Sequence, residues 1–319
     1  PSSSGVEACE TAVKLARRWG YQCKGVEQDR ARILLLRGCF WGRSVTACGG
    51  SSDPLRSLDF GPTTPGFDLV SYDDPSAVER YLERAPDCVA VMVEPIQGEG
   101  GTVVPRDGYL ARLRELTLQH NALLICDEVQ TGLGRTGTLM GYHHDLPSHD
   151  AKPDIVVLGK ALSAGYSPVS GAVADDRVMG LLGLGEHGST FGGSPLGMAV
   201  ARRALGLMLE EGIIANAERV GAQMRARLSA IAAEDARRRG DGAPPFHVRG
   251  RGLMNAIVVD PEILDPERFC DRLRVRGILT RVGGGGVIRF TPPLVISPNE
   301  AEEACERVEV ALLDCHRDN

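Results

Sequence analysis

Short apolar runs alternate with amphipathic stretches through the first two thirds of the chain. Runs without charged residues are typical of strands that are buried on both faces of a sheet. The predicted strands are residues 33–36, 89–93, 123–126, 155–158 and 171–174. Apolar positions at helical spacing lie between them and predict helices at residues 7–19, 76–84 and 108–120. The alternation predicts an α/β fold, a mostly parallel sheet flanked by helices, in which ligands bind at the carboxyl ends of the strands.

The pattern changes near Gly212. A long helix is predicted at residues 195–211, followed by helices at 213–234 and 266–276 and strands at 253–259 and 287–290. This mixture predicts a smaller α+β domain, so that residues 1–211 form a large domain and residues 212–319 a small one. The polar segment 235–245 and the glycine run 283–286 are predicted to be loops or turns, because glycine permits positive φ.

Composition narrows the class of function. The chain has 319 residues, 43% of them hydrophobic, and a net charge of −6, which does not attract nucleic acid or an anionic membrane. No apolar stretch approaches the roughly 20 residues of a membrane-spanning helix. The nine cysteines are widely spaced without a Cys-x-x-Cys pair, which is typical of reduced thiols in a reducing compartment. We therefore expect chemistry on small molecules, with neither nucleic acid nor membrane as a partner.

Lys160 directly follows the predicted strand 155–158. An amine that is desolvated at a strand end has a lowered pKa and becomes a nucleophile toward carbonyl carbon, which is the chemistry of a Schiff base. Position alone also permits an ordinary solvated lysine.

Asp127 and Glu128 follow the apolar run 123–126. A carboxylate there can hold a cationic ring nitrogen, coordinate a metal or cap the next turn. A phosphate-loop ATPase would also need Gly-x-x-x-x-Gly-Lys-Ser/Thr, but the Gly159-Lys160 pair is followed by Ala161. The phosphate loop is therefore absent, which argues against an ATPase of that class.

Several loops are candidates for anion binding. Ser4 and Glu7 form a capping box at a helix start, where backbone N–H groups and the helix dipole attract phosphate. The hydroxyl and glycine cluster 187–193 is either a second phosphate contact or a tight turn. Residues 132–137 match the Gly-x-Gly-x-x-Gly fingerprint of dinucleotide sites, but they do not join a strand directly to a helix, and we interpret them as a turn.

The segment Phe40-Trp41-Gly42-Arg43 places flat aromatic rings beside a guanidinium. Such a group can stack on a planar cofactor and bind a carboxylate through two hydrogen bonds, or it can be a core aromatic next to a surface arginine. The histidines 143, 144 and 149, with the aspartates 145 and 150, lack an established ligand spacing, so no metal site is predicted.

Five segments occur in order along nearly the whole chain: Ser4-Gly5-Val6-Glu7-Ala8, Glu94-Pro95-Ile96-Gln97-Gly98-Glu99, Asp127-Glu128-Val129-Gln130-Thr131-Gly132, Leu158-Gly159-Lys160-Ala161 and His187-Gly188-Ser189-Thr190. Together they resemble the class III pyridoxal-phosphate-dependent aminotransferases. Within that class, Phe40-Trp41-Gly42-Arg43, Phe60-Gly61-Pro62 and Ile288-Arg289-Phe290 resemble the members that act on ornithine.

The resemblance implies pyridoxal-phosphate transferase fold type I, pyridoxal 5'-phosphate (PLP) as cofactor, and a homodimer. It implies transfer of the δ-amino group of L-ornithine to 2-oxoglutarate, giving L-glutamate 5-semialdehyde and L-glutamate, in arginine metabolism and proline biosynthesis. Another class III activity, on acetylornithine or 4-aminobutyrate, is the enzymatic alternative. Neither the mitochondrial matrix nor the cytoplasm is favoured as the compartment.

The resemblance also implies roles for individual residues. Lys160 would bind the cofactor covalently and Asp127 would pair with its ring nitrogen, as the catalytic pair. The other cofactor contacts would be the backbone of Gly5 and Val6, the aromatic rings of Phe40 and Trp41, the side chain of Gln130, and Ser189 and Thr190 reaching the phosphate of the neighbouring subunit. Arg43 would bind the substrate α-carboxylate, and Glu99 with Arg289 would form a switchable ion pair that admits either a cationic amine or a dicarboxylate.

The chain also departs from the family. Family members carry a segment on the order of a domain before the Gly-Val-Glu-Ala loop, whereas Pro1 precedes that loop closely here. A truncated, inactive homologue is therefore an alternative expectation. Cys9 and Ser194 stand where the family usually has glycine and asparagine.

Overall fold

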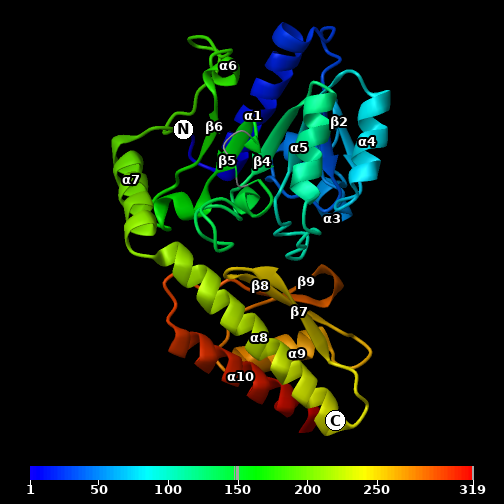
Figure 1. Ribbon diagram of the computed structural model, residues 1–319, viewed down its shortest axis with the longest axis vertical. Coiled ribbons are helices and arrows are strands. Elements are labelled where there is room, and N and C mark those ends of the chain that lie inside the picture. The colour runs from blue at the N-terminus through cyan, green and yellow to red at the C-terminus, as the bar shows by residue number, and fades with distance from the viewer. Residues whose placement is uncertain (147, 149–150, 318–319) are drawn as a thin grey trace. The chain divides into compact units, whose positions relative to one another are not determined.

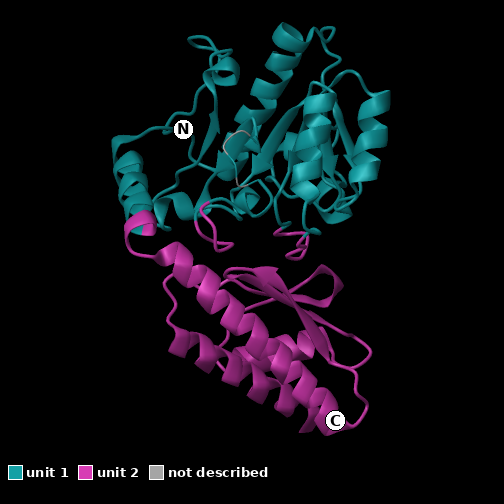
Figure 2. Cartoon of the chain, viewed as in Figure 1, with its two compact units in different colours: residues 1–97, 105–133, 140–207 teal, residues 98–104, 134–139, 208–319 magenta. Residues whose placement is uncertain are grey.

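The computed structural model describes residues 1–146, 148 and 151–317, which divide into two compact units (Figure 2). Unit 1 comprises Pro1–Gln97, Pro105–Leu133 and Met140–Leu207, and unit 2 comprises Gly98–Val104, Gly134–Leu139 and Met208–Asn319. The units are defined by packing, and the domain boundary between residues 211 and 212 stays a prediction.

Unit 1 is built on a mostly parallel sheet. In the described part of the chain this sheet has six strands in the order β2-β1-β3-β4-β5-β6, of which β6 alone runs antiparallel to its neighbour. The strands are β1 Arg32–Leu36, β2 Phe67–Val70, β3 Cys88–Val93, β4 Leu123–Asp127, β5 Ile155–Leu158 and β6 Gly171–Ala174. The predicted fold class and five predicted strands are confirmed. Strand β2 was missed because Asp68 interrupts its apolar pattern, and that carboxylate accepts a hydrogen bond of 2.6 Å from Arg32 on the adjacent strand.

Helices cover both faces of this sheet (Figure 1). Alternate strand residues point to opposite faces. Ile33 and Leu35 therefore pack in one core with α1 (Gly5–Trp19), while Leu34 and Leu36 pack in the other. The second core is closed by α4 (Pro75–Arg84) and α5 (Tyr109–Gln119). The shorter helices of unit 1 are α2 Val45–Gly49, α3 Pro54–Ser57 and α6 Asp176–Met179, and α7 (Pro195–Glu210) leads toward unit 2 along the chain.

Unit 2 pairs an antiparallel sheet with helices. Its strands, in the order β7-β8-β10-β9, are β7 Phe246–Arg251, β8 Met254–Val259, β10 Val287–Phe290 and β9 Val282–Gly283. The helices α8 (Ile213–Arg239), α9 (Pro266–Val275) and α10 (Pro298–Arg317) share one apolar core with the sheet. The glycine run 283–286 does turn, with Gly285 at φ +69°. None of the described helices is both long and apolar enough to cross a membrane.

The prediction that residues 235–245 form a loop is wrong for residues 235–239, which continue α8. Asp235 is buried there because it accepts from Arg239 at 2.8 Å and lies 2.9 Å from the His316 ring nitrogen. The helix ends at Gly240, whose φ of +79° is the left-handed conformation that glycine permits.

A buried carboxylate joins three elements of unit 1. Asp154 accepts from the Arg114 guanidinium at 2.6 Å, from the Arg177 guanidinium at 2.6 Å and from the Leu124 amide at 2.9 Å. The side chains of Asp154 and Arg114 are 4% and 9% exposed, so the buried Arg114 guanidinium depends on Asp154 for neutralisation.

We predict that Asp154→Asn lowers the free energy of unfolding by about 3–5 kcal/mol, because it leaves the buried Arg114 guanidinium without a counter-charge. Urea denaturation followed by circular dichroism measures the change. Glu115→Gln is the matched control, since Glu115 pairs with Arg112 at the exposed surface, where an ion pair is worth less than about 1 kcal/mol. Equal losses in the two variants would contradict the assignment.

Candidate active site

Asp127 is the last residue of the central strand β4 and is 4% exposed. Its Oδ1 accepts from the Val129 amide at 3.0 Å, and its Oδ2 accepts from the Cys9 thiol at 3.5 Å. Burial raises the pKa of Asp127, and the Val129 amide, the Cys9 thiol and the positive charge of Lys160 oppose that rise. A cationic group at this carboxylate would therefore be strongly favoured.

Lys160 begins the short 3-10 helix η4, Lys160–Ser163, immediately after β5 and Gly159. Its φ of +41° is unusual for a residue with a side chain. Of the two alternatives for Lys160, a desolvated amine or an ordinary exposed lysine, the structure favours the second, because Lys160 is exposed where the chain turns out of the sheet. Its charge still acts on Asp127, so the predicted catalytic pair lies at one edge of the sheet.

The first turn of α1 reaches the same edge. Ser4 caps the helix, and the Glu7 carboxylate accepts from the amides of Ser3 at 3.0 Å and Ser4 at 2.8 Å, so the predicted capping box is confirmed. A Cβ on Gly5 would lie 3.0 Å from Val129 Cγ1, and one on Gly159 would lie 3.3 Å from the same atom. The Val129 side chain therefore packs between the start of α1 and the end of β5.

The aromatic segment packs against this turn. A Cβ on Gly42, whose φ is +144°, would lie 2.3 Å from Val6 Cγ2. The Phe40 amide donates to Glu94 Oε1 at 2.9 Å, and the Arg43 guanidinium carbon lies 5.5 Å from the Phe40 ring centroid. Arg43 is exposed and Phe40 is half-buried. Their predicted contacts with a cofactor and a substrate stay predictions.

Trp41 lies differently from Phe40. Its side chain is 5% exposed and packs in the sheet core, with its ring centroid 5.8 Å from that of Phe67. Its buried indole nitrogen has no hydrogen-bond partner within the described residues. These contacts favour a packing role for Trp41, and its predicted contact with a cofactor stays a prediction.

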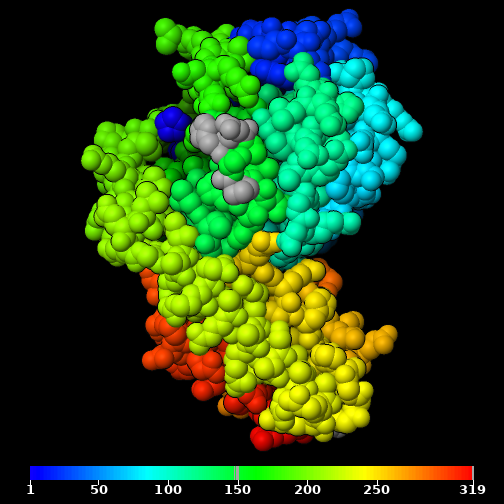
Figure 3. Space-filling view, in the orientation of Figure 1, coloured from blue at the N-terminus to red at the C-terminus, as the bar shows by residue number. Residues whose placement is uncertain are grey.

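The segment that contains Ser189 and Thr190 also approaches α1. The Ser189 hydroxyl donates to Glu7 Oε1 at 3.0 Å, and Thr190 is exposed. A Cβ on Gly193 would lie 3.2 Å from Pro1 Cγ. The space-filling view shows the first residues of the chain at the surface of this region (Figure 3).

Glu99 and Arg289 form an ion pair within unit 2, as the resemblance implies. Arg289 Nη1 lies 2.5 Å from Glu99 Oε1, and both side chains are 19% exposed. Arg281 approaches the other oxygen of Glu99 at 3.6 Å and is itself 73% exposed. Glu99 thus faces two arginines, of which Arg289 is the more sheltered.

Sequence reasoning assigned no role to Glu128, although it lies beside Asp127 in the acidic pair. Its carboxylate is 1% exposed and accepts from the Thr131 hydroxyl at 2.5 Å, the Gly141 amide at 2.9 Å and the Tyr142 amide at 2.7 Å. Burial raises the pKa of Glu128 to about 7. Gln130, which was predicted, is half-buried in the turn that Glu128 begins.

The residues at this edge fit PLP. A buried carboxylate suits its protonated ring nitrogen, an exposed lysine amine suits its carbonyl, and the first turn of α1 suits its phosphate. Gly5 and Gly159 pack closely against Val129, and Gly42 packs closely against Val6, so the start of α1, the end of β5 and the aromatic segment adjoin at this edge.

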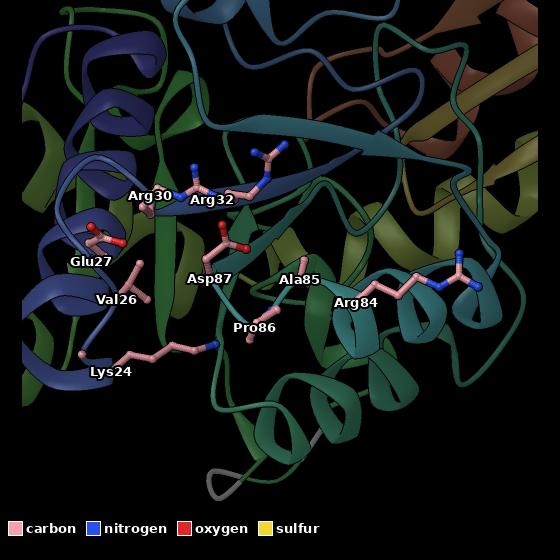
Figure 4. Close-up of a pocket in the computed structure, with 10 residues that line it drawn as sticks. Lys24, Val26, Glu27, Arg30, Arg32, Arg84, Ala85, Pro86 and Asp87 are labelled. Carbon is pink, nitrogen blue, oxygen red and sulfur yellow. The ribbon is translucent and has the colours of Figure 1, made fainter.

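A surface pocket of about 610 Å³ lies elsewhere in unit 1 (Figure 4). It is lined by Lys24, Gly25, Val26, Glu27, Arg30, Arg32, Arg84, Ala85, Pro86 and Asp87. Arg32 begins β1 and Asp87 precedes β3, so this pocket is at the amino ends of parallel strands, away from the edge that holds Asp127. It is therefore not the candidate active site.

No cluster of three or more histidine, cysteine, aspartate or glutamate side chains within the described ranges is arranged to hold a metal. His149 and Asp150, which belong to the histidine-rich segment considered above, lie outside the described residues.

Comparison with known proteins agrees with this geometry. The family model Aminotransferase class-III matches residues 1–312. A mitochondrial ornithine aminotransferase of Rattus norvegicus is 45% identical over 314 residues, which are 98% of this chain and 68% of the relative.

Solved structures agree as well. An ornithine aminotransferase of Toxoplasma gondii superposes with a TM-score of 0.92 at 44% identity, covering 99% of this chain and 73% of that one. A second structure of the Toxoplasma enzyme, with PLP at partial occupancy, gives 0.91 at 44% identity over 99% and 72% of the two chains. An acetylornithine aminotransferase of Elizabethkingia anophelis gives 0.81 at 38% identity over 98% and 73%. The match of the family model to nearly the whole chain, together with the buried aspartate and the lysine at one sheet edge, establishes that this chain belongs to the class III aminotransferases.

Proposed function

We propose that the chain is an ornithine aminotransferase, which transfers the δ-amino group of L-ornithine to 2-oxoglutarate and gives L-glutamate 5-semialdehyde and L-glutamate. The observation that carries this choice is the ion pair between Glu99 and Arg289. Relatives that are 45% and 44% identical to this chain, named ornithine aminotransferases, support it.

The ion pair suits an enzyme with two unlike substrates. Ornithine ends in a cation, whereas 2-oxoglutarate carries a second carboxylate. While Glu99 neutralises Arg289, the sheltered guanidinium does not bind the α-carboxylate of ornithine in a wrong orientation. When Glu99 turns to Arg281, which already lies 3.6 Å from it, Arg289 is released to bind a dicarboxylate.

PLP, when bound, supplies the carbonyl that accepts the amino group and the ring that withdraws electrons from the reacting carbon. Asp127 would keep a proton on the ring nitrogen, because a buried carboxylate stabilises a cation beside it. The Lys160 amine would hold the carbonyl in the resting enzyme. Once displaced by substrate, the same amine would move a proton at the reacting carbon, where it is already positioned.

The remaining residues would bind and orient. The amides of Gly5 and Val6 at the start of α1 would hold the phosphate. Phe40 would stack on the ring, Gln130 would contact the ring hydroxyl, and Arg43 would bind the substrate α-carboxylate. We further propose a homodimer in which Ser189 and Thr190 contact the phosphate of the neighbouring subunit.

We predict that Lys160→Ala lowers transaminase turnover by at least about 10²- to 10⁴-fold, because it removes the general acid and base. The absorbance of covalently bound cofactor should also disappear from spectra of the protein with added PLP. Lys152→Ala is the control, since Lys152 pairs with Asp175 at the surface. Persistence of the covalent absorbance in Lys160→Ala would refute the assignment.

We predict that Glu99→Gln lowers kcat/KM for ornithine by about tenfold, because Arg289 is no longer neutralised while the cationic substrate binds. The kcat/KM for 2-oxoglutarate should fall less than the kcat/KM for ornithine, or it should rise. Steady-state assays with ornithine and acetylornithine as competing donors measure both effects and separate the two candidate activities. Glu303→Gln is the control, since Glu303 pairs with Arg307 at the exposed surface of α10 in the same unit. An equal loss for both substrates in Glu99→Gln would argue against the switch.

We predict that Cys9→Ala moves the loss of PLP affinity on acidification to higher pH. The Cys9 thiol opposes the rise in the pKa of Asp127 that burial causes, so its removal raises that pKa further. Asp127 must be ionised to hold the ring cation, and affinity is lost as pH falls through its pKa. Cofactor titrations at several pH values test this. Cys88→Ala removes a buried thiol that donates a hydrogen bond to the Ala90 carbonyl, and it should leave the pH dependence of PLP affinity unchanged.

A further inference from the structure

Glu128 accepts hydrogen bonds from the two residues that flank the segment 132–140, namely Thr131 and Gly141. Along the chain, Thr131 lies where unit 1 is left and Gly141 lies where it is re-entered. Both donate to the same Glu128 oxygen, at 2.5 Å and 2.9 Å, and Tyr142 donates to the other oxygen at 2.7 Å. One carboxylate therefore fixes the exit and the return of the chain.

The close approach at Gly141 shows how tightly this contact is built. A Cβ there would lie 2.9 Å from Thr131 Cβ and 3.0 Å from Glu128 Oε2. The Gly141 amide also begins a 3-10 helix, Gly141–His144, that has no side-chain cap from its own N-cap residue. Glu128, the residue that follows β4, supplies that cap.

The turn that Glu128 begins carries two residues toward the candidate cofactor site. The Gly132 amide donates to the Glu128 carbonyl at 3.0 Å, which closes the turn over Val129 and Gln130. Val129 packs against Gly5 and Gly159, and its amide donates to Asp127. Displacement of this turn would therefore move a contact of Asp127 and the residue proposed to meet the ring hydroxyl.

Stability alone does not account for this carboxylate. The three donors that satisfy it are a hydroxyl and two amides, all neutral. A buried carboxylate held only by dipoles costs more free energy than a neutral side chain of the same shape. A role in positioning the turn that follows Glu128 would explain why this cost in free energy is kept.

We propose that Glu128 is a positioning residue for the cofactor, which through Thr131, Gly141 and Tyr142 fixes the turn that places Val129 and Gln130 beside Asp127. This inference rests on the proposed PLP site and adds a residue that does not touch the cofactor.

Thr131→Val tests the proposal, because it removes one donor to Glu128 and keeps the β-branched shape. Three quantities are measured: the PLP dissociation constant of the cofactor-free protein, the absorbance maximum of bound cofactor, and kcat and KM for ornithine. We expect an approximately tenfold weaker affinity, which corresponds to the loss of one hydrogen bond to a charged group, together with a shifted absorbance maximum. Thr131→Ser, which restores the hydroxyl, should return both to the wild-type values.

Thr117→Val is the matched control. Thr117 is fully buried in α5, and its hydroxyl donates to the Arg114 carbonyl at 2.9 Å. It should lower the free energy of unfolding measured by urea without changing the dissociation constant or the spectrum. Glu128→Gln should weaken PLP more than Thr131→Val. If it does not fold, the two Thr131 variants decide the question.

Wild-type affinity and an unshifted spectrum in Thr131→Val, with reduced stability, would assign Glu128 a structural role and overturn the proposal. Failure of Thr131→Ser to restore affinity would also overturn it. A wild-type protein that does not bind PLP would instead overturn the proposed function, and the inference with it.

Discussion

The burial of two successive carboxylates at the end of β4 is the constraint on which the site depends. Residues of a strand alternate between faces, so Asp127 shares the face of Ile125 and meets Cys9 of α1, whereas Glu128 shares the face of Cys126. Each carboxylate therefore has its own donors on its own side of the sheet. These separate donors stabilise both acids, although the charge of Asp127 still contributes to the raised pKa of Glu128.

Local pattern was sufficient for most of unit 1. Uninterrupted apolar runs placed β3, β4 and β5, and with them the strand ends that carry Asp127 and Lys160. Other elements were missed because they contain charged residues whose partners come from distant parts of the sequence. Asp68 in β2 pairs with Arg32 of the neighbouring strand, and Asp235 in α8 pairs with His316 of α10. Neither partner is near in sequence, so hydrophobic periodicity does not reveal such pairs.

The same distinction applies to the site. The capping box of Ser4 and Glu7 was predictable, because both residues lie in one helical turn. The Glu99–Arg289 pair spans 190 positions and followed only from the resemblance. The exposure of Lys160 and the burial of Trp41 depend on how the chain leaves β5 and on packing against Phe67. Residue type and position do not determine these properties, since they arise from tertiary contacts.

The two carboxylates also differ in what balances their charge. Asp127 accepts from one amide and one weakly donating thiol, which only partly oppose the rise in its pKa that burial causes. A cation bound there would supply the missing stabilisation, so the free energy that burial costs the protein becomes affinity for the ligand. Glu128 instead has three short contacts from the chain itself. Asp127 can thus accept a further donor from a ligand, whereas Glu128 is satisfied by donors of the chain itself and holds in place the turn that runs from Glu128 to Gly132.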